Sequence, residues 1–237
     1  MTETIRINKF FTQHGVCSRR EADRLIEAGR VVINGRVAQI GDQVGPGDVI
    51  ARDGQVIPWG QAAIYIKYHK PVGVTTTSEA HVPRNIIAEI GHSERIFPIG
   101  RLDKDSSGLI LLTNDGDIVN VVLRTEHGHE REYDVTVDRP FDQTFLDRMA
   151  SGVMILGDRT KPCRIGRVAP ARFRIVLTEG RNRQIRRMCS TLGYRVVTLH
   201  RVRIMHITIG SLPVGKWKPL TPEERRRLLE AVGRTPG

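Results

Sequence analysis

A polar segment, residues 100–108, lies between two apolar stretches and contains the residue types best suited to chemistry. It places the carboxylate of Asp103 between the cations Arg101 and Lys104. Neighbouring positive charges keep a carboxylate ionised, which suits it to act as a nucleophile or a general base. Loops between strands often present functional side chains. The alternative is a solvated turn held by ion pairs, and the residue types alone leave both interpretations open.

The acidic residues near this segment also allow a metal site, although the pattern is weak. Magnesium could be held by a set of alternating acids, namely Asp103, Asp105, Asp115 and Asp117. A calcium loop is excluded because Asn114 stands at the twelfth loop position, where a bidentate Glu is required. The eight histidines and three cysteines show no metal-ligand spacing. We therefore expect no metal, with a metal-dependent nuclease as a lesser alternative.

A run of arginines, residues 179–189, follows an apolar stretch and begins a predicted helix. On that helix Arg183 shares a face with Arg186 and Arg187, whereas Ile185 belongs to the opposite, buried face. Basic side chains at the start of a helix can bind phosphates through their guanidinium groups and the free amides. Because the run contains one acid, we favour nucleic-acid binding over a solvated cationic face.

Tyr133 is one of few aromatic residues in a chain that is 5% aromatic. An aromatic ring on a nucleic-acid-binding protein can stack on a base. A tyrosine within a strand more often packs in the core, and the residue by itself leaves both interpretations open.

The net charge indicates a polyanionic partner. The 237 residues include 37 Lys and Arg against 26 Asp and Glu, a net charge of +11. Residues 159–203 hold 13 of the basic residues and one acid, so the whole excess lies in one fifth of the chain. Nucleic acid is the first candidate partner and an anionic membrane surface the second. No apolar run approaches the roughly 20 residues of a membrane span, and we expect no membrane partner.

A mixture of strands and helices must position these groups. Apolar stretches predict strands at residues 63–68, 108–113, 132–137, 173–178 and, with a break, 195–209. Amphipathic stretches predict helices at residues 84–90, 117–124, 142–150, 182–192 and 223–232. Their irregular alternation favours an α+β fold with a mostly antiparallel sheet flanked by helices.

The first sixty residues predict a separate small αβ domain. Ser18 and Glu21 form a capping box ahead of an amphipathic helix, and Asn34-Gly35 marks a hairpin turn. This order brings basic side chains near one another, among them Arg19, Arg20, Arg24 and Arg36. Since Pro58-Trp59-Gly60 is typical of a boundary, we expect domains at residues 1–60 and 61–237.

Four motifs resemble those of the RsuA/Rlu family of pseudouridine synthases. Gly-Arg-Leu-Asp at residues 100–103, with Ser-Gly-Leu at 107–109, resembles their catalytic motif. Lys-Pro-Val-Gly at residues 70–73 resembles their KPxG motif, and residues 179–188 their C-terminal arginine motif. Residues 18–35 resemble part of an S4 RNA-binding domain. The motifs occur in the family's order over nearly the whole chain.

Within that family, the chain is most similar to the F type of large-subunit synthase, a subgroup that acts on 23S rRNA. The similarity lies in residues 41–44, 101–105 and 154–157. The resemblance implies the pseudouridine synthase fold and isomerisation of uridine in RNA, in which the base is cut from the ribose, turned and rejoined through C5. No atom is added and no electron leaves, so no cofactor is implied. A non-catalytic rRNA-binding assembly factor is the alternative.

The resemblance also implies roles for the candidate site residues. Asp103 is implied as the nucleophile, and Tyr133 would pack on the flipped base. Arg186 is our choice to pair with Asp103 while Arg183 holds RNA phosphate, although these two roles could be exchanged. Apolar walls that exclude water would come from Leu102 and Ile185. The other RNA-binding candidates are Arg101, Lys104, Gln184 and Arg187 near the site, and Arg19, Arg20, Arg24 and Arg36 in the S4-like domain.

We expect the RNA partner to be 23S rRNA, with tRNA left open as a second substrate. We also expect a monomer in the cytoplasm. The first ten residues lack an apolar signal region, and three widely spaced cysteines fit a reducing compartment better than a disulfide scaffold.

Overall fold

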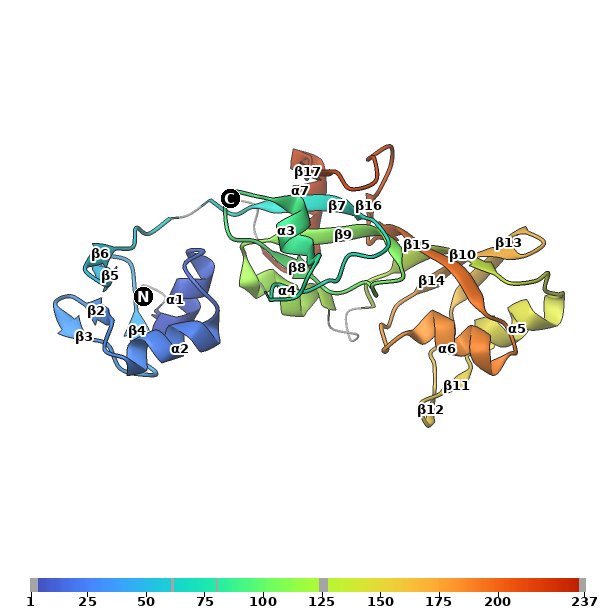
Figure 1. Ribbon diagram of the computed structural model, residues 1–237, viewed down its shortest axis with the longest axis horizontal. Coiled ribbons are helices and arrows are strands. Elements are labelled where there is room, and N and C mark those ends of the chain that lie inside the picture. Colours follow the sequence, from blue (N-terminus) through green and yellow to red (C-terminus); the bar gives the residue numbers. More distant parts are fainter. Residues whose placement is uncertain (1–3, 61, 80, 124–127, 235–237) are drawn as a thin grey trace. The chain divides into compact units, whose positions relative to one another are not determined.

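The chain folds into two units (Figure 1), and each unit has its own hydrophobic core. The computed structural model describes residues 4–60, 62–79, 81–123 and 128–234. Unit 1 contains the chain up to Ile64 together with His92–Ile96 and Thr113–Gly116, and unit 2 contains the rest. The later segments join unit 1 through hydrogen bonds such as the one from the Ile64 amide to Asn114 Oδ1, at 2.8 Å. No helix in the described ranges has the length and apolar character needed to cross a membrane.

Unit 1 combines two helices with short strands. Its elements are β1 (Ile5–Arg6), α1 (Ile7–Gln13), α2 (Arg19–Glu27), β2 (Val31–Ile33), β3 (Arg36–Val37), β4 (Gln43–Val44), β5 (Ile50–Arg52) and β6 (Gln55–Val56). The strands form a β3-β2-β5-β6 sheet and a β1-β4 pair, and both helices bury apolar side chains such as Phe10 and Leu25. Of the predicted capping box, the N-cap half is confirmed, since Ser18 Oγ accepts a hydrogen bond from the Glu21 amide at 3.2 Å; the Glu21 carboxylate accepts from Arg24 Nη1 at 3.1 Å.

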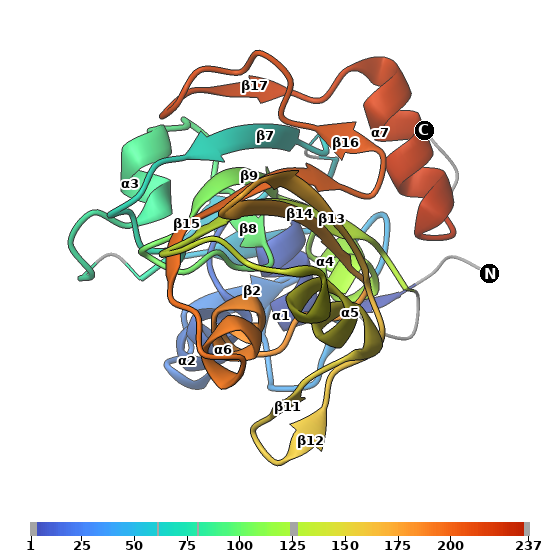
Figure 2. The same ribbon diagram turned by 90° about the vertical axis from the view of Figure 1, so that its right-hand side faces the viewer.

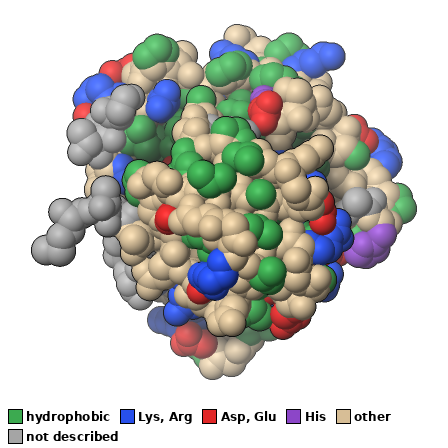
Figure 3. All heavy atoms as spheres, turned by 90° about the vertical axis from the view of Figure 1, so that its left-hand side faces the viewer, with side chains coloured by type: hydrophobic (Ala, Val, Ile, Leu, Met, Phe, Trp, Pro, Cys, Tyr) green, Lys and Arg blue, Asp and Glu red, His purple; other side chains and the backbone are tan. Residues whose placement is uncertain are grey.

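The predicted hairpin of unit 1 is also confirmed. Asn34 and Gly35 have φ angles of 49° and 82°, as a type I′ turn between β2 and β3 requires. The surface of unit 1 is mixed in character. Figure 3 shows basic and acidic side chains interspersed with hydrophobic ones on the face it presents.

Unit 2 is built on a nine-stranded sheet whose main order is β13-β14-β10-β15-β9-β7-β17, with β16 beside β15 and β8 beside β9. The strands are β7 (Tyr65–Lys70), β8 (Phe97–Ile99), β9 (Ser107–Thr113), β10 (Arg131–Val137), β13 (Arg164–Ala169), β14 (Arg172–Leu177), β15 (Val196–Ile204), β16 (Ile207–Thr208) and β17 (Trp217–Pro219). Antiparallel pairing runs from β13 to β15, whereas β15 and β9 are parallel. The mostly antiparallel mixed sheet of an α+β fold is therefore confirmed.

Helices flank this sheet (Figures 1 and 2). They are α3 (Ile86–Ile90), α4 (Gly116–Leu123), α5 (Gln143–Ser151), α6 (Gln184–Thr191) and α7 (Pro222–Ala231). The last residue of the helix predicted at 117–124, Arg124, lies outside the described residues. A small hairpin of β11 (Met154–Ile155) and β12 (Asp158–Arg159) projects from the body of unit 2 (Figure 2). Strand β9 forms the centre of the core, with Leu109, Ile110, Leu111 and Leu112 all buried.

Candidate active site

The segment that carries Asp103 is a tight turn between β8 and β9. The Ser106 amide donates to the Asp103 carbonyl at 3.0 Å, which closes the turn. Thr76 Oγ1 donates to the Leu102 carbonyl at 2.7 Å, and the Gly73 amide donates to the Lys104 carbonyl at 2.7 Å. The chain that follows β7 thus holds the turn on both sides of Asp103.

Lys70, the last residue of β7, also holds this turn in place. Its side chain is fully buried, and Nζ donates to the carbonyls of Ser106 at 2.8 Å and Pro71 at 2.9 Å. Burial lowers the pKa of Lys70 to about 8, and the nearby carboxylates of Asp105 and Asp103 oppose that shift. The lysine of the Lys-Pro-Val-Gly motif therefore holds in place the turn that carries Asp103.

Asp103 is paired with an arginine, although not with the one we expected. Arg183 Nη1 lies 3.4 Å from Asp103 Oδ2, and Arg183 Nη2 lies 3.0 Å from Asp105 Oδ2. The hydrogen bonds from Arg183 lower the pKa of Asp105. Arg183 can reach both carboxylates because it is the N-cap residue of α6, with a left-handed φ of 50°.

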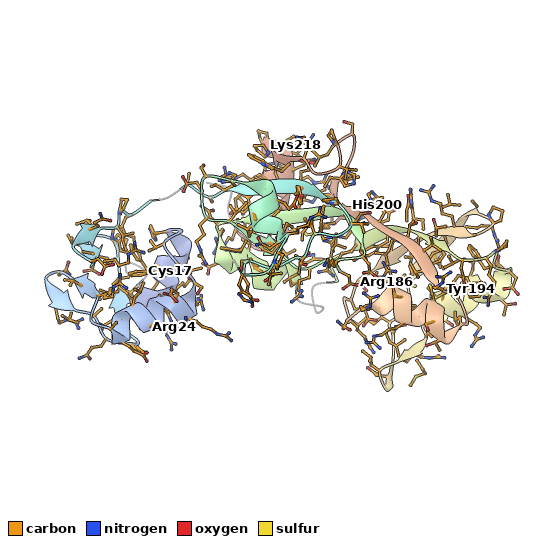
Figure 4. The ribbon with its side chains drawn as sticks, in the orientation of Figure 1. Cys17, Arg24, Arg186, Tyr194, His200 and Lys218 are labelled. Carbon is orange, nitrogen blue, oxygen red and sulfur yellow. The ribbon has the colours of Figure 1, made fainter. Side chains whose placement is uncertain are left out.

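The expected pairing of Arg186 with Asp103 is corrected by this geometry. Arg186, labelled on α6 in Figure 4, donates from Nη2 to the Asp105 carbonyl at 2.9 Å and to Ser106 Oγ at 3.2 Å. Its Nε lies 3.4 Å from Asp105 Oδ2. The Arg186 guanidinium thus binds Asp105 and Ser106. Arg183 is therefore the arginine that pairs with Asp103.

A pocket of about 530 Å³ opens beside this pair. Leu102 and Ile185 are buried in its wall, in the places expected of water-excluding apolar residues. Tyr133, on β10, also lines the pocket and is 9% exposed. The structure thus brings Asp103, Tyr133, Arg183 and Arg186 to one cavity. The Tyr133 ring could cover a planar base that enters it.

The remaining candidate RNA-binding residues near the pocket differ in how far their side chains are free to contact RNA. Arg101 and Lys104 are exposed on either side of the buried Leu102. Arg187 is half-buried, and its Nε donates to the Asn182 carbonyl at 3.0 Å. Gln184 is a correction: it is buried, and both ends of its amide are used inside the protein. Its Nε2 donates to Glu179 at 2.8 Å, while its Oε1 accepts from the Arg181 amide at 3.0 Å.

The arginines predicted for RNA binding in unit 1 are all exposed. Arg19, Arg20 and Arg24 lie on α2, and Figure 4 shows Arg24 on this helix. Arg24 makes an exposed ion pair with Glu21 at 3.1 Å, and Arg36 makes one with Asp42 at 3.0 Å. Such surface pairs are weak, so these side chains stay available to a polyanion.

Two buried arginines in the pocket wall were missed by the sequence analysis. Arg131 and Arg201 are both buried and line the pocket, and Arg201 lies with its guanidinium carbon 6.0 Å from the centre of the Tyr133 ring. Burial lowers the pKa of Arg131. The signal was the spacing of Arg131 and Tyr133, which puts both on one face of a strand. The described residues contain no group of three or more His, Cys, Asp or Glu side chains arranged to hold a metal.

Comparison with known protein families shows which family the chain belongs to. A model of the RNA pseudouridylate synthase family matches residues 64–191, and a model of the S4 domain matches residues 5–50. The chain belongs to the RNA pseudouridylate synthase family. It is an enzyme that isomerises uridine to pseudouridine in RNA, which confirms the catalytic interpretation over the assembly-factor alternative.

Curated relatives agree with this assignment. The dual-specificity RNA pseudouridine synthase RluF of Escherichia coli K12 is 51% identical over 231 residues, which are 97% of this chain and 80% of that protein. The ribosomal large subunit pseudouridine synthase B of Bacillus subtilis is 31% identical, covering 94% of this chain and 95% of that protein. The expected F-type resemblance is thereby confirmed.

A solved structure shares the fold over nearly the whole chain. A crystal structure of a pseudouridylate synthase superposes with a TM-score of 0.70 at 28% identity. The match covers 94% of this chain and 99% of that one. The pseudouridine synthase fold expected from the motifs is therefore confirmed.

Proposed function

We propose that Asp103 is the nucleophile of this synthase and that the pocket beside it receives the target uridine. The observation that supports this most directly is the position of Asp103: its side chain is 36% exposed at the pocket, next to the guanidinium of Arg183. A guanidinium beside the carboxylate can hold it in position for attack. The sugar of a flipped nucleotide can then meet Asp103 while its base lies against Tyr133.

The reaction needs one bond broken and one formed, with no net change of atoms. The N1–C1′ bond of uridine breaks, the base turns, and C5 bonds to C1′. The hydrogen on C5 leaves as a proton and N1 gains one. Asp103 serves this sequence by attack at C1′ or at C6, or by taking the C2′ proton. Leu102 and Ile185 keep water from the pocket, which protects the opened intermediate from hydrolysis.

The substrate is proposed to be 23S rRNA, with tRNA as a second class of substrate. The support is the F-type resemblance and the dual specificity stated in the name of the E. coli relative. We further propose that residues 1–60 act as an RNA-binding domain through Arg19, Arg20, Arg24 and Arg36. In the catalytic domain, residues 61–237, the exposed Arg101 and Lys104 and the half-buried Arg187 would contact RNA beside the pocket. We propose a cytoplasmic monomer.

Mapping pseudouridine tests the proposed substrate. RNA from cells with and without the gene would be chemically treated so that reverse transcriptase stops at each pseudouridine. The proposal expects a stop in 23S rRNA that disappears when the gene is deleted and returns with the wild-type gene but not with the Asp103→Asn gene. An unchanged 23S rRNA pattern would reject rRNA as the substrate, and a tRNA stop lost while the 23S rRNA pattern stays unchanged would reassign the enzyme to tRNA.

A further inference from the structure

Arg201 has an unusual position for a charged residue. It lies on β15 between two residues of the site, since its register partners are Tyr133 on β10 and Gly108 on β9. Arg201 is 3% exposed. Its Nε donates to the Leu109 carbonyl at 2.7 Å and its Nη1 to the Arg101 carbonyl at 3.4 Å. It thus bridges the two ends of the turn that carries Asp103.

One donor atom of the Arg201 side chain makes no hydrogen bond. Within the described residues, Nη2 of Arg201 has no hydrogen-bond partner, and no carboxylate lies within ion-pair distance of the guanidinium. A buried donor without an acceptor is costly, and native structures satisfy such groups unless the site has another purpose. Arg201 lines the pocket and protein atoms cover its Nη2, so a small shift of the side chain on nucleotide binding would bring the spare donor to the cavity.

The residues that line the pocket differ in exposure, and the difference fits a nucleotide that enters base first. Arg183 and Asp103 have side chains that are 41% and 36% exposed. Tyr133 and Arg201 are only 9% and 3% exposed. The RNA backbone continues on both sides of the target nucleotide, so its phosphates must stay near the exposed arginines. The atoms that reach Arg201 are then those of the base.

We propose that Nη2 of Arg201 donates a hydrogen bond to a carbonyl oxygen of the target uracil. This inference rests on the proposed function of the pocket. Whether Asp103 attacks C1′ or C6, electron density moves onto the carbonyl oxygens of the base, where a fixed cationic donor stabilises it. A guanidinium is suited to this because it remains charged when buried.

The same donor can serve before and after the base turns. Rotation about the line through N3 and C6 exchanges N1 with C5 and at the same time exchanges the carbonyls at C2 and C4. A donor at a fixed place in the wall therefore meets a carbonyl oxygen in both orientations. Arg201 therefore need not move between the two halves of the reaction. Its backbone packs closely against that of Gly108, which restricts such movement.

The experiment uses short RNAs that carry uridine, 4-thiouridine or 2-thiouridine at the target position, because sulfur is a poor hydrogen-bond acceptor. We expect wild-type kcat/KM to fall by about tenfold to a hundredfold with at least one thio RNA, the range for a hydrogen bond to a charged group. Arg201→Met should show a loss of similar size with uridine and less than about threefold further loss with either thio RNA. Arg203→Met is the control. Arg203 lies on the same strand, beyond a register shift that pairs it with Glu132, and should keep the wild-type pattern.

Two outcomes would overturn the proposal. The first is a wild-type enzyme that loses less than about threefold with both thio RNAs, a result that needs no variant to fold. The second is an Arg201→Met enzyme as sensitive to sulfur as the wild type, which would leave Arg201 a purely structural role. Failure to form pseudouridine in the uridine RNA would instead reject the proposed function.

Discussion

The backbone of Gly108 lies so close to the backbone of Arg201 that no side chain fits between their strands. A Cβ atom on Gly108 would stand 2.3 Å from the Arg201 carbonyl oxygen and 2.5 Å from its nitrogen. The φ of Gly108 is +112°, which other residues rarely adopt. This contact joins the end of the catalytic turn to β15, directly beside Tyr133, and so fixes the distance between Asp103 and the pocket wall.

Replacing Gly108 by Ala should therefore disturb both stability and activity. We expect a loss of at least about 1–3 kcal/mol in the free energy of unfolding from backbone strain alone. The clash should add to this loss and lower kcat by separating β9 from β15. Urea unfolding and single-turnover rates would measure the two effects. Gly157→Ala is the control, because Gly157 also has a positive φ, +82°, but nothing within 4 Å of its Cβ position. Equal losses in the two variants would contradict the close-approach argument.

Arg183 and Arg186 should respond differently to truncation. Arg183→Ala removes the partner of Asp103 from an exposed site, so we expect kcat to fall tenfold or more, as is typical of a charge-assisted contact. Its free energy of unfolding should change little. Arg186→Ala leaves a turn carbonyl without its donor and should cost about 1–3 kcal/mol of stability as well as activity. An Arg183→Ala enzyme with wild-type kcat would show that its pairing with Asp103 has no role in turnover.

The RNA-binding surface that we propose for unit 1 can be tested without changing the pocket that contains Asp103. Changing Arg19, Arg20, Arg24 and Arg36 together to Gln should weaken RNA binding while kcat at saturating RNA stays unchanged. The slope of log K against log salt should become shallower by roughly 0.7–0.9 for each RNA phosphate that the variant no longer binds. Arg30→Gln is the matched control, because Arg30 is engaged by both oxygens of Asp53 at 2.7 Å. An unchanged salt slope in the fourfold variant would place the RNA elsewhere.

Lys70 should make stability depend on pH in the alkaline range. Its pKa is about 8 in the folded protein and near 10.5 when unfolded, so between these values the unfolded chain holds more protons. The free energy of unfolding of the wild type should therefore rise, relative to Lys70→Met, as pH increases from about 8 to 10.5. Denaturant unfolding of both proteins at several pH values measures this difference. A difference that stays flat or falls over that range would show that Lys70 is not desolvated in the folded state.

The elements that the sequence did predict are those with a clear apolar pattern. Strand β9 and helix α6 were placed within two residues of their observed starts, because buried faces leave a periodic signal. Strands β13 and β17 were missed, since their residues are largely exposed and β17 contains Pro219. The attachment of Thr113–Gly116 to unit 1 depends on long-range hydrogen bonds of Asn114 that no local pattern records.

The candidate site was predicted in part for similar reasons. The motif identified Asp103 and the arginine run, but the choice between Arg183 and Arg186 depends on the left-handed backbone at the start of α6. Lys70, Arg131 and Arg201 were assigned no role at the site because a basic residue in a sequence normally indicates the surface. Their burial becomes visible only when the sheet has brought β7, β10 and β15 together.

The most direct test of the central claim is pseudouridine formation by Asp103→Asn. The substitution keeps the size of the side chain and removes its charge. Release of tritium from C5 of labelled uridine in 23S rRNA would report turnover, and filter binding would report affinity for the same RNA. We predict normal binding and a turnover lower by roughly 10⁴-fold or more, the scale on which loss of a nucleophile acts. A variant that still releases tritium at a rate near that of the wild type would show that the chemistry does not pass through Asp103.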